Sequence, residues 1–216
     1  MTEGYACIDP QNLSAKENYF LLTSLVVPRP IAWVSTIDNQ GYTNLAPFSY
    51  FNGVCSDPAL ISISVVDTPK GAKDTLRGMM DKGTFCVNIV EAHHAKAMHL
   101  TSGAFEPDES EFEMANLESV PCSIIPGIRV ADVRAALECR VVDRHVYGNT
   151  HKANLVIGEV LRVHLAQELL APRRLMADNT KMESLARLGG GHYAALKAPF
   201  KFASIDLQAV RESKIS

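Results

Sequence analysis

Apolar residues recur at every second position in several short segments of this 216-residue chain. The alternation is strict over 59–66, where Ile61, Ile63 and Val65 share one face and serines occupy much of the other. This period is typical of a β-strand with one buried face. β-Branched residues and alternation predict further strands at 30–37, 85–90, 135–146 and 155–165.

The segments between these strands are short. Residues 38–41 (Asp-Asn-Gln-Gly) and 147–151 are typical of hairpin loops. Helices are expected only at about 72–80, from the spacing of apolar residues, and more weakly at 91–100. We therefore expect a mainly β fold, a closed barrel with peripheral helices, rather than alternating α/β. The expected organisation is one domain over 1–216, with a core of about 20–193 and a peripheral segment at 194–216.

Composition excludes several functional classes. The net charge of −3 gives no reason to expect a nucleic-acid or anionic-membrane partner. No apolar run approaches the ~20 residues that span a bilayer, and the N-terminus does not resemble a signal peptide. Five cysteines without a C-x-x-C pair favour buried, reduced thiols, and hence a cytoplasmic protein.

The familiar catalytic motifs are absent from the sequence. It contains no G-x-G-x-x-G, Walker A, H-E-x-x-H or G-x-S-x-G segment. His93, His94 and His99 are not spaced i, i+4, so no metal site is predicted. A chain without its own nucleophile or metal can still be an enzyme when a cofactor supplies the chemistry.

Polar residues gather around the start of the helix expected near residue 72. Lys70, Lys73 and Thr75 lie there, with Thr68 or Asp74 as the expected capping residue. Free N–H groups, a hydroxyl and a cation together suit a phosphate. The same residues are also compatible with an ordinary solvated helix start, and spacing alone leaves both interpretations open.

Longer stretches of sequence resemble a known family. They are Pro28–Thr36 (PRPIAWVST), Asn44–Phe51 (NLAPFSYF), Asp57–Pro58, Lys73-Asp74-Thr75 followed by 83–88, and Arg187–Tyr193 (RLGGGHY). Their order and spacing are similar to those of the flavin reductase-like family. That family includes flavoredoxin and the reductase components of two-component flavin monooxygenases, such as nitrilotriacetate monooxygenase component B.

The resemblance implies a split β-barrel that binds FMN, generally as a homodimer with the flavin near the subunit interface. Carried over by position, the implied flavin-lining residues are Ser35, Thr36, Asn44, Leu45, Ala46, Ser49 and Phe51, acting largely through backbone and hydroxyl groups. Toward the ribityl chain and phosphate it implies Ser62, Ser64, Lys73 and Thr75. His192, within a run of glycines, is a candidate for the flavin or nicotinamide pocket or part of a flexible segment. Arg29 could contact a nucleotide or form a structural salt bridge, whereas Trp33 and Asn88 are expected to be structural.

The resemblance also implies an activity, that of an NAD(P)H-dependent flavin reductase. Hydride transfer would take place between the two cofactors, so no catalytic side chain is predicted. A partner monooxygenase or redox protein would receive reduced flavin or electrons. Two alternatives stay open: a flavoredoxin-type electron carrier, and a non-catalytic flavin-binding protein. No residue in the sequence indicates whether NADH or NADPH is preferred.

Overall fold

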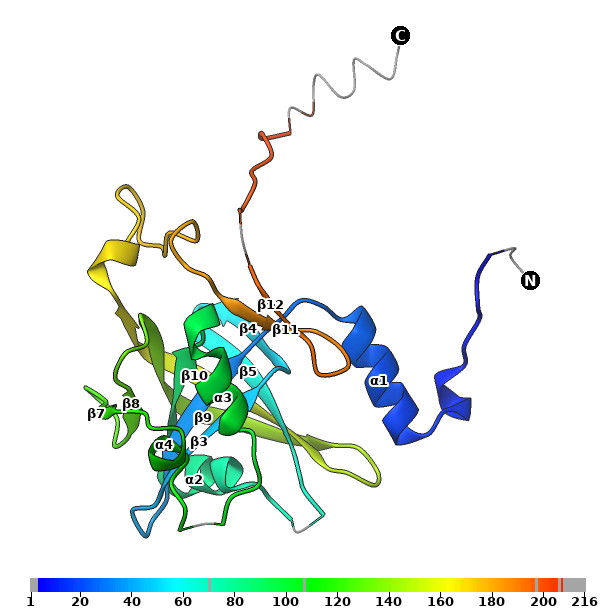
Figure 1. Cartoon of the computed structure of the whole chain (residues 1–216), viewed down its shortest axis with the longest axis horizontal. Coiled ribbons are helices and arrows are strands. Elements are labelled where there is room, and N and C mark those ends of the chain that lie inside the picture. Colours follow the sequence, from blue (N-terminus) through cyan, green and yellow to red (C-terminus); the bar gives the residue numbers. More distant parts are fainter. Residues whose placement is uncertain (1–3, 70, 107, 197, 206, 208–216) are drawn as a thin grey trace.

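A computed structural model describes residues 4–69, 71–106, 108–196, 198–205 and 207. Its centre is a curved seven-stranded antiparallel sheet (Figure 1). In spatial order its strands are β3 (Thr43–Phe48), β2 (Ala32–Ile37), β6 (Thr84–Ile89), β9 (Ala135–Tyr147), β10 (Ala153–Leu165), β5 (Ala59–Val66) and β4 (Phe51–Ser56).

Smaller elements surround this sheet. The sheet β1 (Arg29–Pro30), β11 (Leu185–Arg187), β12 (Tyr193–Ala195) joins segments far apart in the sequence, and β7 (Ser119–Pro121) pairs with β8 (Ile128–Val130). The α-helices are α1 (Ala15–Leu25), α2 (Asp74–Lys82), α3 (Ala95–Leu100) and α4 (Glu111–Met114). Short 3-10 helices are η1 (Pro10–Asn12), η2 (Ala92–His94) and η3 (Gln167–Leu169).

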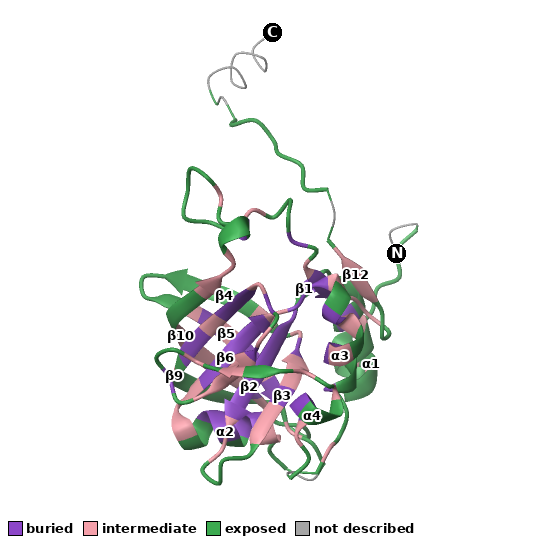
Figure 2. Ribbon diagram, turned by 60° about the vertical axis from the view of Figure 1, so that its left-hand side comes forward, coloured by how far each residue is buried: buried purple, intermediate pink, exposed green. Residues whose placement is uncertain are grey.

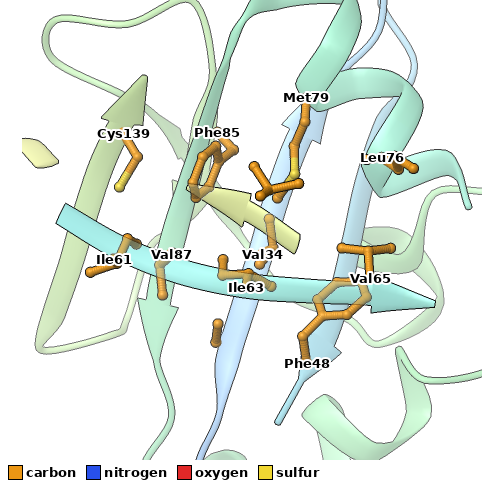
Figure 3. Close-up of a cluster of buried hydrophobic side chains, with 12 residues drawn as sticks. Val34, Phe48, Ile61, Ile63, Val65, Leu76, Met79, Phe85, Val87 and Cys139 are labelled. Carbon is orange, nitrogen blue, oxygen red and sulfur yellow. The ribbon is translucent and has the colours of Figure 1, made fainter. Parts of the chain in front are cut away.

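Strand β2 is buried on both faces, and this divides the interior into two clusters. Val34 packs with the inward-facing residues of β5 and with one side of α2, as Figure 3 shows. Trp33, on the opposite face of β2, packs with Met98 and Phe112. Figure 2 shows the buried residues gathered along the middle of the sheet and against α2, while the segment leading to the C-terminus is exposed.

The barrel is split between β3 and β5. These strands approach one another where Phe48 and Val65 share a cluster (Figure 3), but they are not neighbours in the hydrogen-bonded sheet. A mainly β fold with peripheral helices is therefore confirmed, and its split-barrel form agrees with the structural comparison reported below.

The local predictions are confirmed where the pattern was strong. β5 spans the predicted 59–66, and the 38–41 hairpin closes through Asp38 N–H to Tyr42 O at 3.0 Å. The predicted capping was wrong. The helix begins at Asp74, Lys73 is its N-cap, and no side chain caps it. Asp74 fails as a cap because it lies inside the first turn, where it pairs with Arg77.

Two further expectations are corrected. Helix α1 was not expected, although Ser14 and Glu17 form a capping box at its start. Buried thiols are found at Cys86 and Cys139, but Cys7 and Cys55 are exposed. Among the described residues, no helix is both long and apolar enough to cross a bilayer.

Candidate functional site

Of the candidate flavin-lining residues, Ser35, Thr36 and Leu45 have side chains within the protein core. Ser35 is 1% exposed; its hydroxyl donates to Ile128 O at 2.6 Å and accepts from the Asn88 amide. The Leu45 side chain is fully buried in the cluster around Trp33. A flavin contact from Ser35 or Leu45 would have to come from the backbone. Asn88 is the structural amide that the sequence predicted, because it also bonds Trp33 O and Val130 N–H.

Thr36, Asn44 and Thr75 meet beneath the start of α2. The Asn44 amide and the Thr75 hydroxyl are hydrogen-bonded at 2.8 Å, and Thr36 lies against Gly78 of α2. When the Asn44 side-chain amide is turned so that its nitrogen faces the carboxylate of Glu111, that nitrogen donates to Glu111 Oε1 at 3.2 Å. The Thr75 hydroxyl is therefore buried and already paired, whereas the sequence suggested an open phosphate ligand.

Glu111 is a member of this group that the sequence did not reveal. Its carboxylate accepts from the Leu45 N–H at 3.0 Å, at the free edge of β3. Burial raises the pKa of this carboxyl, and the Leu45 hydrogen bond opposes that rise only in part. Glu111 thus occupies the backbone donor of one of the predicted flavin-contacting residues. No local motif marks it, because it approaches β3 from α4.

Lys73 keeps its ammonium group available. Its Nζ lies 5.5 Å from the centre of the Phe48 ring, and it forms no ion pair with any described residue. The nine-residue helix that follows has no side-chain cap, so its first-turn N–H groups have no capping partner from a described residue. Lys70, the other lysine considered for a phosphate, lies outside the described residues.

Ser62, Ser64 and Phe51 lie at the other side of the split. The serines alternate with the buried face of β5, so their side chains point away from the core, and neither hydroxyl is hydrogen-bonded to a described residue. Phe51 is half-buried and pairs across the strands with Ile63, and Ala46 is half-buried against the same core cluster. These residues supply neutral donors and a partly apolar surface.

A pocket of about 200 Å³ lies beside the end of β3. Its wall combines aromatic and apolar side chains with polar ones and one guanidinium, and it consists of Tyr19, Ile31, Pro47, Ser49, Met98, His99, Ser102, Arg187 and Tyr193. Arg187 stacks on Tyr193 at 4.4 Å, and the Tyr193 hydroxyl lies 3.3 Å from His99 Nδ1. We call this the aromatic pocket. Of the predicted site residues, only Ser49 contributes to it.

His192 and Arg29 have structural roles in the same region. His192 closes the turn between β11 and β12, with its ring and its N–H both directed at Gly189 O. Gly190 and Gly191 have φ of +61° and +86°, so the glycines serve this turn. Arg29 is 4% exposed and bonds the carbonyl oxygens of Thr23, Val26 and Leu188, rather than a carboxylate.

The chemical types of these groups suit the parts of a flavin nucleotide. An unpaired ammonium beside an uncapped helix suits a phosphate, free hydroxyls suit a ribityl chain, and an aromatic pocket suits a planar ring. Ser49 belongs to the pocket, and its neighbour Phe48 contacts Lys73. The groups that suit a phosphate and those that suit a planar ring therefore lie on either side of the end of β3.

Comparison with known proteins gives the family context. The model of the flavin reductase like domain matches residues 24–208. An uncharacterized protein of Bacillus subtilis (strain 168), YwrF, is 37% identical over 87% of this chain and 93% of its own length.

Solved structures agree with this similarity. Nitrilotriacetate monooxygenase component B from Bacillus cereus is 34% identical, with a TM-score of 0.86 over 93% of this chain and 100% of that one. A putative flavin reductase with a split barrel domain from Shewanella frigidimarina NCIMB 400 has a TM-score of 0.79 over 90% of this chain and 96% of its own. At 22% identity, the second comparison shows the fold alone.

Proposed function

We propose that this chain, which belongs to the flavin reductase-like family, binds FMN and that NADH or NADPH reduces the bound flavin. Membership of this family supports a flavin-related redox function. The reduced flavin, or its electrons, would then pass to a partner monooxygenase or redox protein. Three features of this chain support the proposal: the aromatic pocket, the Lys73 ammonium, which has no ion partner among the described residues, and the hydroxyls of Ser62 and Ser64.

The observation that carries the choice of FMN is the position of Lys73. A half-buried lysine without an ion partner among the described residues, at the uncapped start of a nine-residue helix, favours an anionic ligand. Riboflavin has no such anion, and FMN carries it at the end of the ribityl chain. We therefore assign Lys73 to the phosphate, and Ser62 and Ser64 to the ribityl hydroxyls.

The protein's part in the reaction is to bind and orient. When bound, the flavin supplies the redox chemistry by accepting a hydride from the reduced nicotinamide. In this proposal, the Arg187–Tyr193 pair and His99 line the surface against which the rings lie. No side chain is assigned as a catalytic acid or base. Positioning of two reactants can lower a barrier by about 7–11 kcal/mol without such a group.

A homodimer is part of the same proposal. The aromatic pocket, at about 200 Å³, is smaller than the roughly 300–1,000 Å³ of sites that enclose a ligand of this size. Helix α1, beside it, exposes Tyr19, Phe20, Leu22 and Leu25. A second subunit that covers α1 would enlarge the enclosure and bury this apolar surface. Light scattering is expected to give twice the chain mass; a monomer that binds FMN tightly would contradict the shared site.

The absorption spectrum of the purified protein tests the function. We expect a flavin spectrum after addition of FMN, bleached anaerobically by NADH or NADPH, and steady nucleotide oxidation when FMN is in excess. Reduction of the bound flavin without steady turnover would favour the electron-carrier alternative. Tight FMN binding without reduction by either nucleotide would favour a non-catalytic flavin-binding protein.

A further inference from the structure

A cluster of potential metal ligands shares no residue with the proposed flavin site. His93 and His94 are consecutive in η2, and Asp132 follows β8 in the turn that leads to β9. One ligand atom from each residue lies within 4.8 Å of the others. His94 Nε2 and Asp132 Oδ1 are 3.4 Å apart, and the two imidazole rings are 3.8 Å apart, centre to centre.

His94 is the unusual member of this cluster. It is 3% exposed, yet neither of its ring nitrogens makes a well-formed hydrogen bond with a described residue; Nε2 has only the 3.4 Å approach of Asp132 Oδ1. Its ring lies 5.9 Å from that of Trp33, so the buried imidazole is packed in place. Buried polar groups are normally paired, since leaving one unpaired costs about 1–3 kcal/mol. The unpaired nitrogen that faces Asp132 needs an explanation.

A bound cation would supply it. Zn²⁺ binds imidazole nitrogen and carboxylate oxygen at about 2.0–2.2 Å, which separates two ligands of a tetrahedral ion by about 3.4 Å. The distance between His94 Nε2 and Asp132 Oδ1 already has this value. His93 is exposed, so its side chain can rotate to bring its nitrogen closer. A water molecule would complete a tetrahedral set of four ligands.

We propose that His93, His94 and Asp132 bind one divalent transition-metal ion, of which Zn²⁺ is the type. The ion would join η2 to the turn after β8. An ion pair between Glu91 and Arg134 already links these two segments. The sequence predicted no metal site because its histidines lack the spacing of two ligands on one helix. The third ligand, Asp132, instead comes from a turn that is distant in the sequence and lies beside η2 in the fold. This site is independent of the flavin proposal.

The test is a calorimetric titration of the chelator-treated, full-length protein with Zn²⁺. We expect one ion per chain. Asp132→Asn and His93→Ala remove exposed ligands without disturbing the core, and each is expected to weaken binding by about tenfold or more. With Co²⁺ in place of Zn²⁺, the wild type should show the visible absorption of a tetrahedral site, and both variants should lose it.

The matched control is Asp143→Asn. Asp143 pairs with His145 at 2.9 Å on the surface. Among the described residues, this pair belongs to no group of three potential metal ligands. This variant keeps all seven histidines and all five thiols, and it should bind Zn²⁺ as the wild type does. The proposal is overturned if the wild type binds no Zn²⁺ at 100-fold molar excess, if Asp132→Asn binds as tightly as the wild type, or if Asp143→Asn weakens binding equally.

Discussion

Arg29, in β1, donates from Nη2 to the carbonyl oxygen of Leu188 at 3.1 Å and so ties β1 to the turn that follows β11. The same guanidinium bonds the carbonyl oxygens of Thr23 and Val26 at the end of α1. One buried side chain thus fixes three segments around the aromatic pocket. The two roles considered from the sequence, a nucleotide contact and a salt bridge, are both replaced by this backbone clamp.

Replacing Arg29 by methionine should therefore destabilise the fold. The change leaves several carbonyl oxygens without their charged donor, and we expect a loss of about 2–4 kcal/mol in the free energy of unfolding. Urea unfolding measures it. Arg140→Met, which removes an exposed ion pair with Glu159, is the control and should cost less than about 1 kcal/mol. Equal losses would show that Arg29 is not a clamp.

Gly158 is expected to tolerate no side chain. A Cβ at this position would lie 2.4 Å from Phe85 Cζ, and Phe85 is itself 1% exposed in the core. Gly158→Ala should lower the free energy of unfolding by about 1–3 kcal/mol, because the ring has little room to move. Gly53 also lies in a strand, but a Cβ there meets nothing within 4 Å. If both alanine variants are equally stable, the close packing of Gly158 is wrong.

The sequence predicted best where the structure depends on local pattern. The bounds of β5 follow from its alternation alone, since only a half-buried strand needs that period. Helix α1 was missed because its apolar residues, among them Tyr19 and Leu25, form no buried stripe; the capping box at Ser14 was the available signal.

The candidate site was predictable only in part. The resemblance brought in Lys73 and Ser49 by position, and the structure gives both a suitable environment. It could not show that the Thr75 hydroxyl is paired with Asn44, nor that Glu111 reaches the edge of β3. Such contacts join segments far apart in the sequence, and the pattern within each segment carries no information about them.

Glu138 should make stability depend on pH. Burial alone would raise the pKa of this carboxyl, but hydrogen bonds from Ser123, Ile124 and His164 outweigh it and lower the pKa to about 2. The folded pKa thus lies below the unfolded value of 4.5. The resulting stabilisation is present above pH 4.5 and is lost as the pH falls toward 2. A shift of this size corresponds to roughly 3 kcal/mol.

Urea unfolding of the wild type and of Glu138→Gln at pH 7, 4 and 2.5 measures this effect. The difference in stability between the two proteins should be largest at pH 7 and should shrink at each lower pH. Glu159→Gln, at an exposed ion pair, is the control and should show little such trend. A constant difference for Glu138→Gln across the pH range would exclude a lowered pKa.

Lys73→Ala should weaken the binding of FMN and leave that of riboflavin nearly unchanged. The lysine is half-buried beside Phe48 and has no described ion partner, so the variant removes a charge that the fold does not use for pairing. Loss of one charged hydrogen bond to a phosphate costs about 1.5–3 kcal/mol, or roughly 10- to 150-fold in affinity. Fluorescence titration with each flavin measures both affinities. Lys82→Ala, at the opposite end of α2, is the control and should bind FMN as the wild type does, because the phosphate is expected at the start of the helix. If Lys73→Ala weakens the binding of both flavins equally, or of neither, the lysine does not contact the phosphate.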